Sequence, residues 1–389
     1  MEEYDKIEIQ QICSNICSGG TPKSTVAEYY GGNIPWLNTK EINFCRIYKT
    51  EKTITDEGFN NSSAKWIPAN SVIVAMYGAT AGKTAITRIP LTTNQACCNL
   101  TIDSTKADYR FAYYALCNDY AFLSSLANGG AQQNLNTQQI KEFEIPFPSL
   151  REQKRIADIL SSLDDKIELN RRINDNLEQQ AQTLFDHYFD SGSIYLEDST
   201  TECLTDIAVY LNGLAMQKFP ATDIERSLPV LKIKELGQHK CDNSSDRCSD
   251  SIDADYIIDN GDIIFSWSGT LMVDVWCGGK CGLNQHLFKV TPLKNYPRWF
   301  VYYWTNRHLK NFKLIAKDKA VTMGHIRRSD LENAEVVIPK NLNMLEIDAR
   351  INPLFQSIID RRLEITKLEN IRDTLLPKLM SGELTINEI

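Results

Sequence analysis

Two segments of the chain carry apolar residues in alternating steps of four and three, the spacing of a helix that packs along another helix. In the first segment these positions are Ile156, Leu160, Leu163, Ile167, Asn170, Asn174, Leu177, Ala181, Leu184 and Tyr188. In the second they are Ile347, Ile351, Leu354, Ile358, Arg361, Ile365, Leu368, Arg372, Leu375 and Leu379. The pattern therefore predicts two long helices that pair as a coiled coil.

The order of the segments along the chain favours an antiparallel pair. The first helix leads from one module to the next, and the second helix follows the second module with no further module to reach. The polar residues Asn170, Asn174, Arg361 and Arg372 within the seam are expected to fix its register. A helix of about 40 residues is roughly 60 Å long, so the pair can act as a ruler between the modules.

Outside these segments the pattern indicates mixed α and β structure. The short apolar runs Ser71–Met76 and Asp262–Ser266 lie between turn-forming residues and read as buried strands. Arg110–Cys117 and Arg298–Trp304 read as amphipathic helices whose aromatic faces belong mainly to the core. We predict an α+β fold with two such modules.

The two modules are weakly similar copies. Ile34–Ile42 returns as Leu228–Leu236, and the pair Asn94 and Gln95 returns as Asn284 and Gln285. Each copy closes on a proline, Pro148 or Pro339, before its long helix. We therefore expect a pseudo-two-fold arrangement of four parts: a module at 1–148, a helix at 149–190, a module at 191–341 and a helix at 342–389.

Composition narrows the class of protein. No apolar run approaches the roughly 18–20 residues that span a bilayer, and the first residues lack the basic start of a signal peptide, so we expect a cytoplasmic protein with no membrane contact. The eleven cysteines then fit reduced thiols. Their spacing does not match a structural zinc site, so no metal is expected, although the cysteines of the second module could still meet in space.

The net charge of −8 argues mildly against binding to nucleic acid. One segment of the second module opposes that trend with a single acid, Asp318, among many cations. The cations are Arg307, Lys310, Lys313, Lys317, Lys319, Arg327 and Arg328. This segment either attracts phosphate or is simply a solvated helix face.

Two segments resemble catalytic motifs only superficially. Gly78–Thr84 ends like a phosphate-binding loop, but Tyr77 occupies the position of the required first glycine, and the residues that follow read as a strand. Asn352–Phe355 echoes an adenine methyltransferase motif, but it lies within the second heptad segment. We predict that the chain has no catalytic centre.

Polar, cationic and aromatic residues in the predicted loops are the candidates for contact with DNA. Amides and cations can bond base edges and phosphates. The candidates are Lys40, Tyr77, Thr80, Lys83, Gln132, Gln133, Lys234, Trp267, Thr270, His325, Arg327 and Arg328. For the recurring Asn-Gln pairs a structural role in a turn is favoured over base contact, because the two modules should read different sequences.

Two longer motifs resemble the specificity subunits of Type I restriction–modification enzymes. Ile145–Leu160 is similar to the family's Pro-rich, Glu-Gln-containing start of its first conserved helix, and Asp164–Asn170 continues the likeness. Arg372–Leu384 resembles the family's C-terminal motif. The start of the second helix, Ile338–Leu345, departs from the pattern because it lacks the second proline and the Glu-Gln pair.

The resemblance implies a non-catalytic subunit with two target-recognition domains, each reading one half of a bipartite, asymmetric double-stranded DNA site. It implies that the helices set the spacer and dock two methyltransferase subunits, with restriction–translocase subunits joining the full complex. S-adenosylmethionine, Mg²⁺ and ATP are then expected on those partners and not on this chain. The alternatives are a coiled-coil adaptor with two protein-binding heads and no DNA role, and a lone chain with hidden nuclease activity.

Overall fold

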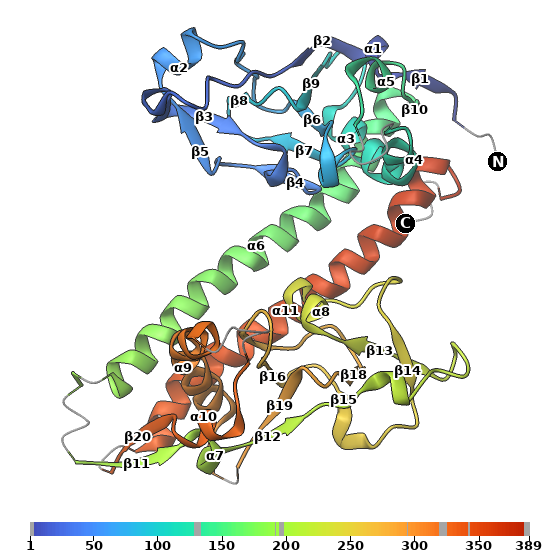
Figure 1. The fold of residues 1–389 in the computed structure, drawn as a ribbon. Coiled ribbons are helices and arrows are strands. Elements are labelled where there is room, and N and C mark those ends of the chain that lie inside the picture. Colours follow the sequence, from blue (N-terminus) through green and yellow to red (C-terminus); the bar gives the residue numbers. More distant parts are fainter. Residues whose placement is uncertain are drawn as a thin grey trace. The chain divides into compact units, whose positions relative to one another are not determined.

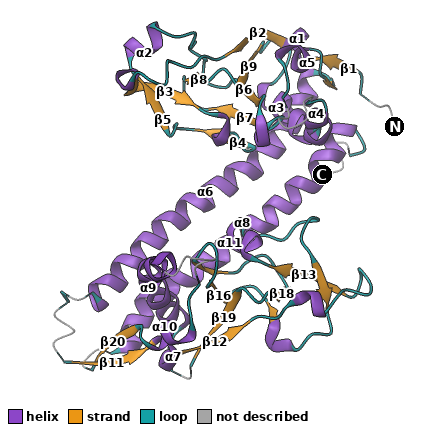
Figure 2. Ribbon diagram, in the orientation of Figure 1, coloured by secondary structure: helices purple, strands orange, loops and turns teal. Residues whose placement is uncertain are grey.

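A computed structural model of the chain describes residues 4–127, 134–190, 192–193, 198–293, 295–318, 325–340 and 343–384. The chain divides into two compact units (Figure 1). Unit 1 comprises Met1–Asp165 and Glu369–Ile389, and unit 2 comprises Lys166–Leu368. Each unit contains one module and a part of both long helices. Figure 2 shows how helices and strands are distributed within them.

The two heptad segments form the helices α6 (Leu150–Phe189) and α11 (Met344–Ser381). In unit 2, Asn170 Nδ2 donates to Glu364 at 2.8 Å, and Asn174 Nδ2 donates to the Ile358 carbonyl at 3.4 Å. Partner numbers on α11 fall as those on α6 rise, so the helices are antiparallel. In unit 1, Arg372 of α11 donates to Asp164 of α6 at 2.8 Å. The predicted antiparallel pairing is therefore confirmed in unit 2, and the same two helices are in contact in unit 1.

The seam is buried mainly where the predicted pattern places it. Eleven predicted positions are buried: Ile156, Leu160, Ile167, Asn170, Asn174, Ala181 and Tyr188 on α6, and Ile347, Ile351, Ile358 and Leu379 on α11. Seven are half-buried: Leu163, Leu177, Leu184, Leu354, Ile365, Leu368 and Leu375. Arg361 donates to Asn170 Oδ1 at 3.3 Å, so polar seam residues of the two helices do contact one another.

Unit 1 is built on a five-stranded sheet in the order β2-β9-β6-β7-β4. Its strands are β2 (Cys13–Ser18), β9 (Cys97–Ile102), β6 (Val72–Ala75), β7 (Thr84–Thr87) and β4 (Cys45–Ile47). A second sheet consists of β5 (Lys52–Ile54), β3 (Tyr30–Leu37) and β8 (Thr92–Thr93), and β1 (Lys6–Glu8) pairs with β10 (Glu144–Pro146). The helices are α1 (Ile9–Ile12), α2 (Asp56–Asn60), α3 (Tyr109–Asn118), α4 (Tyr120–Ser125) and α5 (Thr137–Lys141).

The main core of unit 1 lies between its large sheet and its helices. Phe111 of α3 and Ile156 of α6 are fully buried there. Leu379 and Met380, from the end of α11, are buried in the same cluster. The last turns of the C-terminal helix therefore complete the core of the first module.

Unit 2 repeats this plan with two four-stranded sheets, β12-β19-β16-β17 and β14-β13-β18-β15. The strands of the first are β12 (Ala208–Asn212), β19 (Leu287–Pro292), β16 (Ile263–Ser266) and β17 (Met272–Val275). Those of the second are β14 (Arg247–Ser249), β13 (Ser227–Leu231), β18 (Cys281–Leu283) and β15 (Ile257–Ile258), and β11 (Ser199–Cys203) pairs with β20 (Glu335–Pro339). The helices are α7 (Leu204–Ile207), α8 (Ile233–Gln238), α9 (Arg298–Asp318) and α10 (Arg328–Glu332).

The strand pairings confirm that the modules are copies. Three neighbouring strand pairs are antiparallel in each module. They are β2-β9, β9-β6 and β6-β7 in unit 1, and β12-β19, β19-β16 and β16-β17 in unit 2. The parallel pair β3-β8 returns as β13-β18. The predicted strands at Ser71–Met76 and Asp262–Ser266 form β6 and β16, and the predicted aromatic helices form α3 and α9.

The same close chain crossing occurs in both copies. A Cβ added to Gly19 would lie 2.2 Å from the Thr93 carbonyl oxygen, and one added to Gly213 would lie 2.3 Å from that of Asn284. Only glycine fits at such a crossing. At the crossed segment, Asn94 Oδ1 accepts from the Ala96 N–H at 3.1 Å, and Asn284 Oδ1 accepts from the His286 N–H at 3.3 Å. The structure thus supports the turn-forming role of both asparagines.

A half-buried arginine joins the module of unit 2 to both long helices. Arg362 of α11 donates to Asp274 of β17 at 2.6 Å and to Glu178 of α6 at 2.9 Å. His239 Nδ1 lies 2.8 Å from the other oxygen of Asp274. Burial alone would raise the pKa of Asp274, but the hydrogen bond from His239 and the charge of Arg362 outweigh it, so the pKa is lowered.

None of the helices formed by the residues that the structure describes is long and apolar enough to cross a membrane. The segment Gly78–Thr84 begins with a short 3₁₀ turn, η3 (Gly78–Thr80), and leads into the strand β7. The predicted strand after this segment is therefore confirmed, whereas a phosphate-binding loop would lead into a helix. Asn352–Phe355 lies inside α11, as predicted.

Replacing Arg362 with methionine is expected to lower the free energy of unfolding by about 3–5 kcal/mol, because Asp274 would be left buried without its cation. Urea unfolding at pH 7 measures this. Because folding lowers the pKa of Asp274, this carboxylate stabilises the wild type at pH values above its unfolded pKa of 3.8. That stabilisation is lost as the pH falls below 3.8 and through the folded pKa. The variant should show a smaller loss over that range, and the double variant Arg362→Met/Asp274→Asn should recover part of the stability. Equal stability of wild type and Arg362→Met would contradict this role.

Replacing Asn284 with alanine is expected to lower the free energy of unfolding by about 0.5–1.5 kcal/mol, because the side-chain acceptor of the His286 N–H is lost in a partly buried turn. Asn94→Ala should do the same in the first module. If instead Asn284 reads a base, the variant would keep its stability and change the DNA sequence that is bound. Unfolding curves together with binding to the wild-type sequence separate these results.

Candidate nucleic-acid interface

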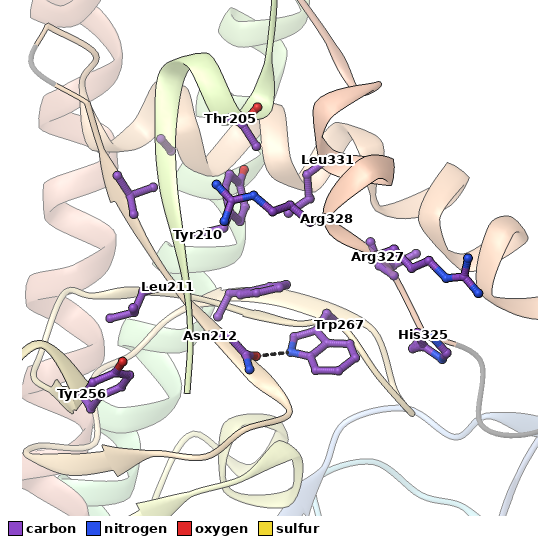
Figure 3. A pocket seen from close by; sticks show the side chains of 14 residues that line it. Thr205, Tyr210, Leu211, Asn212, Tyr256, Trp267, His325, Arg327, Arg328 and Leu331 are labelled. Atoms are coloured by element: carbon purple, nitrogen blue, oxygen red, sulfur yellow. Dashed lines mark hydrogen bonds between the residues drawn. The ribbon is translucent and has the colours of Figure 1, made fainter. Parts of the chain in front are cut away.

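In unit 2 the structure gathers four of the predicted residues around one hollow. Trp267 follows β16, and His325, Arg327 and Arg328 lead into α10. All four line a pocket of about 770 Å³ (Figure 3). Its floor is the edge strand β12 with Phe288 of the neighbouring strand β19, and its full lining is Thr205, Ala208, Val209, Tyr210, Leu211, Asn212, Tyr256, Trp267, Phe288, His325, Ile326, Arg327, Arg328 and Leu331.

Backbone hydrogen bonds hold the walls of this pocket in place. The Ile326 N–H donates to the Trp267 carbonyl at 2.9 Å, and Ser268 and His325 form a β-bridge. The Ser268 hydroxyl, which is buried, lies 3.0 Å from His286 Nδ1 and links the ends of β16 and β19. The segment after β16 and the segment before α10 are therefore one rigid frame.

Side chains of the pocket are also fixed relative to one another. Trp267 Nε1 donates to Asn212 Oδ1 at 2.9 Å, a bond drawn in Figure 3. The Trp267 ring centroid lies 5.8 Å from that of Phe288 and 6.2 Å from that of His325. The Tyr210 hydroxyl is bonded to Thr305 at 2.7 Å. An indole held in this way offers a ring without further loss of side-chain entropy.

The charge at the pocket is positive. Arg327 and Arg328 are exposed, and none of the described lining residues is acidic. Arg328 forms only a long contact of 3.5 Å with Glu332, and its side chain is 81% exposed. In Figure 3 the Arg328 side chain extends toward Tyr210, whereas that of Arg327 points away. Arg328 can therefore meet an anion at the pocket.

The predicted basic segment does not act as one group. The Arg307 guanidinium lies 4.7 Å from the Phe185 ring centroid and bonds Asp186 at 2.6 Å, so it ties α9 to α6 and is not a phosphate contact. Lys310, Lys313 and Lys317 are exposed on α9. Lys319 lies outside the described residues.

In unit 1 the same frame carries different side chains. Tyr77 follows β6 and forms a β-bridge with Asn134, and the Leu135 N–H donates to the Met76 carbonyl at 2.8 Å. Tyr77 is exposed, with Thr80 three residues further in η3. Gln132 and Gln133 would directly precede this bridge, but they lie outside the described residues.

The remaining predicted residues lie on other parts of the modules. Lys83 donates to Asn43 Oδ1 at 2.8 Å. Lys40, in η2 (Thr39–Glu41), forms an ion pair with Glu51 at 2.5 Å, and Lys234 of α8 donates to the Ser244 hydroxyl at 2.9 Å. Thr270 is exposed in the turn between β16 and β17. Lys40 follows β3 and Lys234 follows β13, at matching places in the two modules. Lys234 is not part of the pocket lining.

Sequence reasoning missed Tyr210, Asn212 and Phe288. They lie on the paired strands β12 and β19, about 80 residues apart along the chain. Their strands carry no turn or charge pattern that distinguishes them from core strands. The available signal was the comparison of the two copies, which places larger residues at these positions in the second module.

The cysteines do not form a recognisable metal site. All eleven are free thiols, and among the described residues no group of three or more His, Cys, Asp and Glu side chains is arranged to hold a metal ion. Burial raises the pKa of Cys98 to about 12. In the second module, by contrast, a hydrogen bond with Cys281 lowers the pKa of Cys241.

The chain is similar to known specificity subunits over nearly all of its length. A family model described as "Type I restriction modification DNA specificity domain" matches residues 1–179 and 197–372. The MjaIX specificity subunit of Methanocaldococcus jannaschii is 28% identical over 100% of this chain and 95% of its own length. The EcoBI specificity subunit of Escherichia coli is 21% identical over 96% of this chain and 84% of its own length.

A solved structure agrees in fold. The crystal structure of the Type I restriction–modification S subunit from M. genitalium covers 97% of this chain and 96% of its own, with a TM-score of 0.61 and 19% identity. Together with the duplicated modules and the antiparallel helices, the match of the family model shows that this chain belongs to the family of Type I restriction–modification DNA specificity subunits.

Proposed function

We propose that each module reads one half of a bipartite, asymmetric site in double-stranded DNA. The observation that carries this is one backbone frame with two sets of side chains. The bridge that joins Tyr77 to Asn134 in the first module joins Ser268 to His325 in the second. Because the frame is the same and the side chains differ, the two modules can approach DNA in the same way and select different bases.

The residues that we assign to this reading are those gathered by the frame. In the second module they are Trp267, His325, Arg327 and Arg328, and in the first they are Tyr77 and Thr80, with Gln132 and Gln133 next to them in sequence. Lys40, Lys83, Lys234 and Thr270 are assigned to flanking contacts, since lysine binds phosphate as a point charge. Basic residues near the modules offset the net charge of −8 locally.

We assign the helix pair two further roles, to set the spacer and to dock two methyltransferase subunits. The polar seam residues Asn170 and Asn174, with their bonds to α11, support the first role because they fix the register. Leu169 and Ile371, which are 42% and 38% exposed, support the second because exposed apolar side chains on a helix favour a protein partner.

In this proposal the chain is not itself catalytic. The backbone frame of each module presents aromatic, amide and cationic side chains, which bind nucleic acid. Methyl transfer and cleavage belong to partner subunits. S-adenosylmethionine, Mg²⁺ and ATP would bind those methyltransferase and restriction–translocase subunits.

Exchanging residues 1–148 for the corresponding module of another specificity subunit is expected to change one half of the methylated sequence and leave the other half unchanged. Each half is read by one module, so the halves should be independent. Sequencing that detects methylated adenines in cells carrying the hybrid and its methyltransferase measures this. A change in both halves, or in neither, would contradict the proposal, and lack of DNA binding by the assembled wild-type complex would favour a protein adaptor.

Deleting residues 171–174 from α6 is expected to alter the recognised spacer or abolish methylation. The deletion removes about one helical turn, roughly 6 Å, and breaks the bonds that set the register with α11. A matched control of the original length, Asp175→Ala/Asn176→Ala, changes two exposed residues and should keep the spacer. Full methylation at an unchanged site by the deletion variant would refute the ruler.

A further inference from the structure

The two modules differ where the helix that follows the β-bridge lies beside the edge strand. These are α5 and β2 in unit 1, and α10 and β12 in unit 2. In unit 1, α5 packs against β2 and closes this place. The Ser18 and Thr137 hydroxyl oxygens lie 3.3 Å apart, and Thr137 donates to Met76 Sδ at 3.7 Å. Three small or flexible side chains thus fill the space between helix and strand.

The hydrogen-bond register identifies the equivalent residues in unit 2. Ser18 pairs with Cys98 as Asn212 pairs with Phe288. Met76 and Trp267 each accept the backbone N–H of the residue after the bridge. Thr137 and Arg328 are the first residues of α5 and α10.

Each of these substitutions replaces a smaller side chain with a larger one. Serine becomes Asn212, cysteine becomes Phe288, methionine becomes Trp267 and threonine becomes Arg328. Larger side chains would be expected to fill the space more completely, yet here they stand around the open hollow of about 770 Å³. A volume of that size is typical of a small-ligand site.

The lining defines the chemistry of a ligand. Trp267, Phe288 and Tyr210 provide aromatic surface, and the indole is held by Asn212. Because Asn212 Oδ1 accepts from the indole, its Nδ2 is the group that can donate to a ligand. Arg328 provides a cation at the pocket, where no described lining residue is acidic. Aromatic surface, an amide and an arginine together fit a flat heterocycle that carries an anionic group.

We propose that this pocket of the second module binds a nucleotide, with its base against Trp267 and its phosphate on Arg328. The nucleotide can come from two sources, a strand of the target duplex or a free nucleotide. The duplex source rests on the proposed function, because a base must leave the stack to enter a pocket of this kind. Binding of a free nucleotide does not rest on the proposed function.

The first experiment tests the free source with the purified full-length chain. Equilibrium dialysis compares dAMP with deoxyadenosine, which has the same base and no phosphate. The wild type is expected to bind dAMP about tenfold more tightly, as for a hydrogen bond between charged groups. Arg328→Thr, which installs the residue of the first module, should bind the two compounds equally. Arg226→Thr, at an exposed position of the same module, should behave as the wild type.

The second experiment tests the duplex source with the complex assembled with its methyltransferase subunits. Duplexes carry 5-iododeoxyuridine at single positions of the methylated site, and peptide mass spectrometry maps the crosslinks formed on irradiation. A crosslink at Trp267 that falls at least fivefold in Arg328→Thr supports the duplex source. Trp267→Met should abolish it, and Trp66→Met, at a half-exposed tryptophan of the first module, should not affect it.

The proposal is overturned if dAMP does not bind detectably at millimolar concentration and no duplex crosslinks to Trp267. It is also overturned if Arg328→Thr leaves both dAMP binding and crosslinking unchanged while the variant unfolds at the same denaturant concentration as the wild type. Sequence-specific methylation is measured in the same preparation. If methylation remains specific, only the nucleotide pocket is lost, whereas a complex whose specificity does not depend on this chain would refute the proposed function itself.

Discussion

The structure depends on partly buried ion pairs that attach each module to the helix pair. In unit 2, Arg362 bonds a carboxylate on the module's sheet and another on α6, so three elements share one guanidinium. In unit 1 the equivalent role falls to Asp164 of α6, which accepts from Arg372 of α11 and from the Tyr114 hydroxyl of α3 at 2.6 Å. Ion pairs of this kind add little net stability over apolar packing, but they penalise any alternative alignment because a misplaced charge would be buried alone.

This constraint explains why the modules keep their frame while their side chains diverge. The glycines at the chain crossing recur because the backbone leaves no room for a Cβ, and the asparagines beside them recur because their side chains accept a backbone N–H of the turn. The bridge after β6 and β16 recurs because it links two segments that would otherwise be independent loops. Side chains that project from this frame are free to change, and Met76 and Trp267, which occupy the same place in the two modules, show how far they do.

The sequence predicted the parts of the fold that have a period. Heptad spacing located both long helices, and the repeat between the copies matched the strand β6 with its counterpart β16, because both depend on local pattern. It did not predict the roles of individual charges. Arg307 stands in a basic run, yet it is used inside the unit against Asp186, since an ion pair depends on which helix lies opposite. Asn212 and Phe288 were missed for the related reason that the pairing of β12 with β19 brings them together only after folding.

The burial of Leu379 and Met380 in the core of the first module has a consequence for biosynthesis. The ribosome makes most of that core, including Phe111, long before these two side chains. Until they arrive, Phe111 and its neighbours lack part of their cover, so a prematurely terminated chain presents apolar surface of the sort that chaperones and proteases recognise. We therefore expect a truncated specificity subunit to be degraded before it can bind a partner subunit.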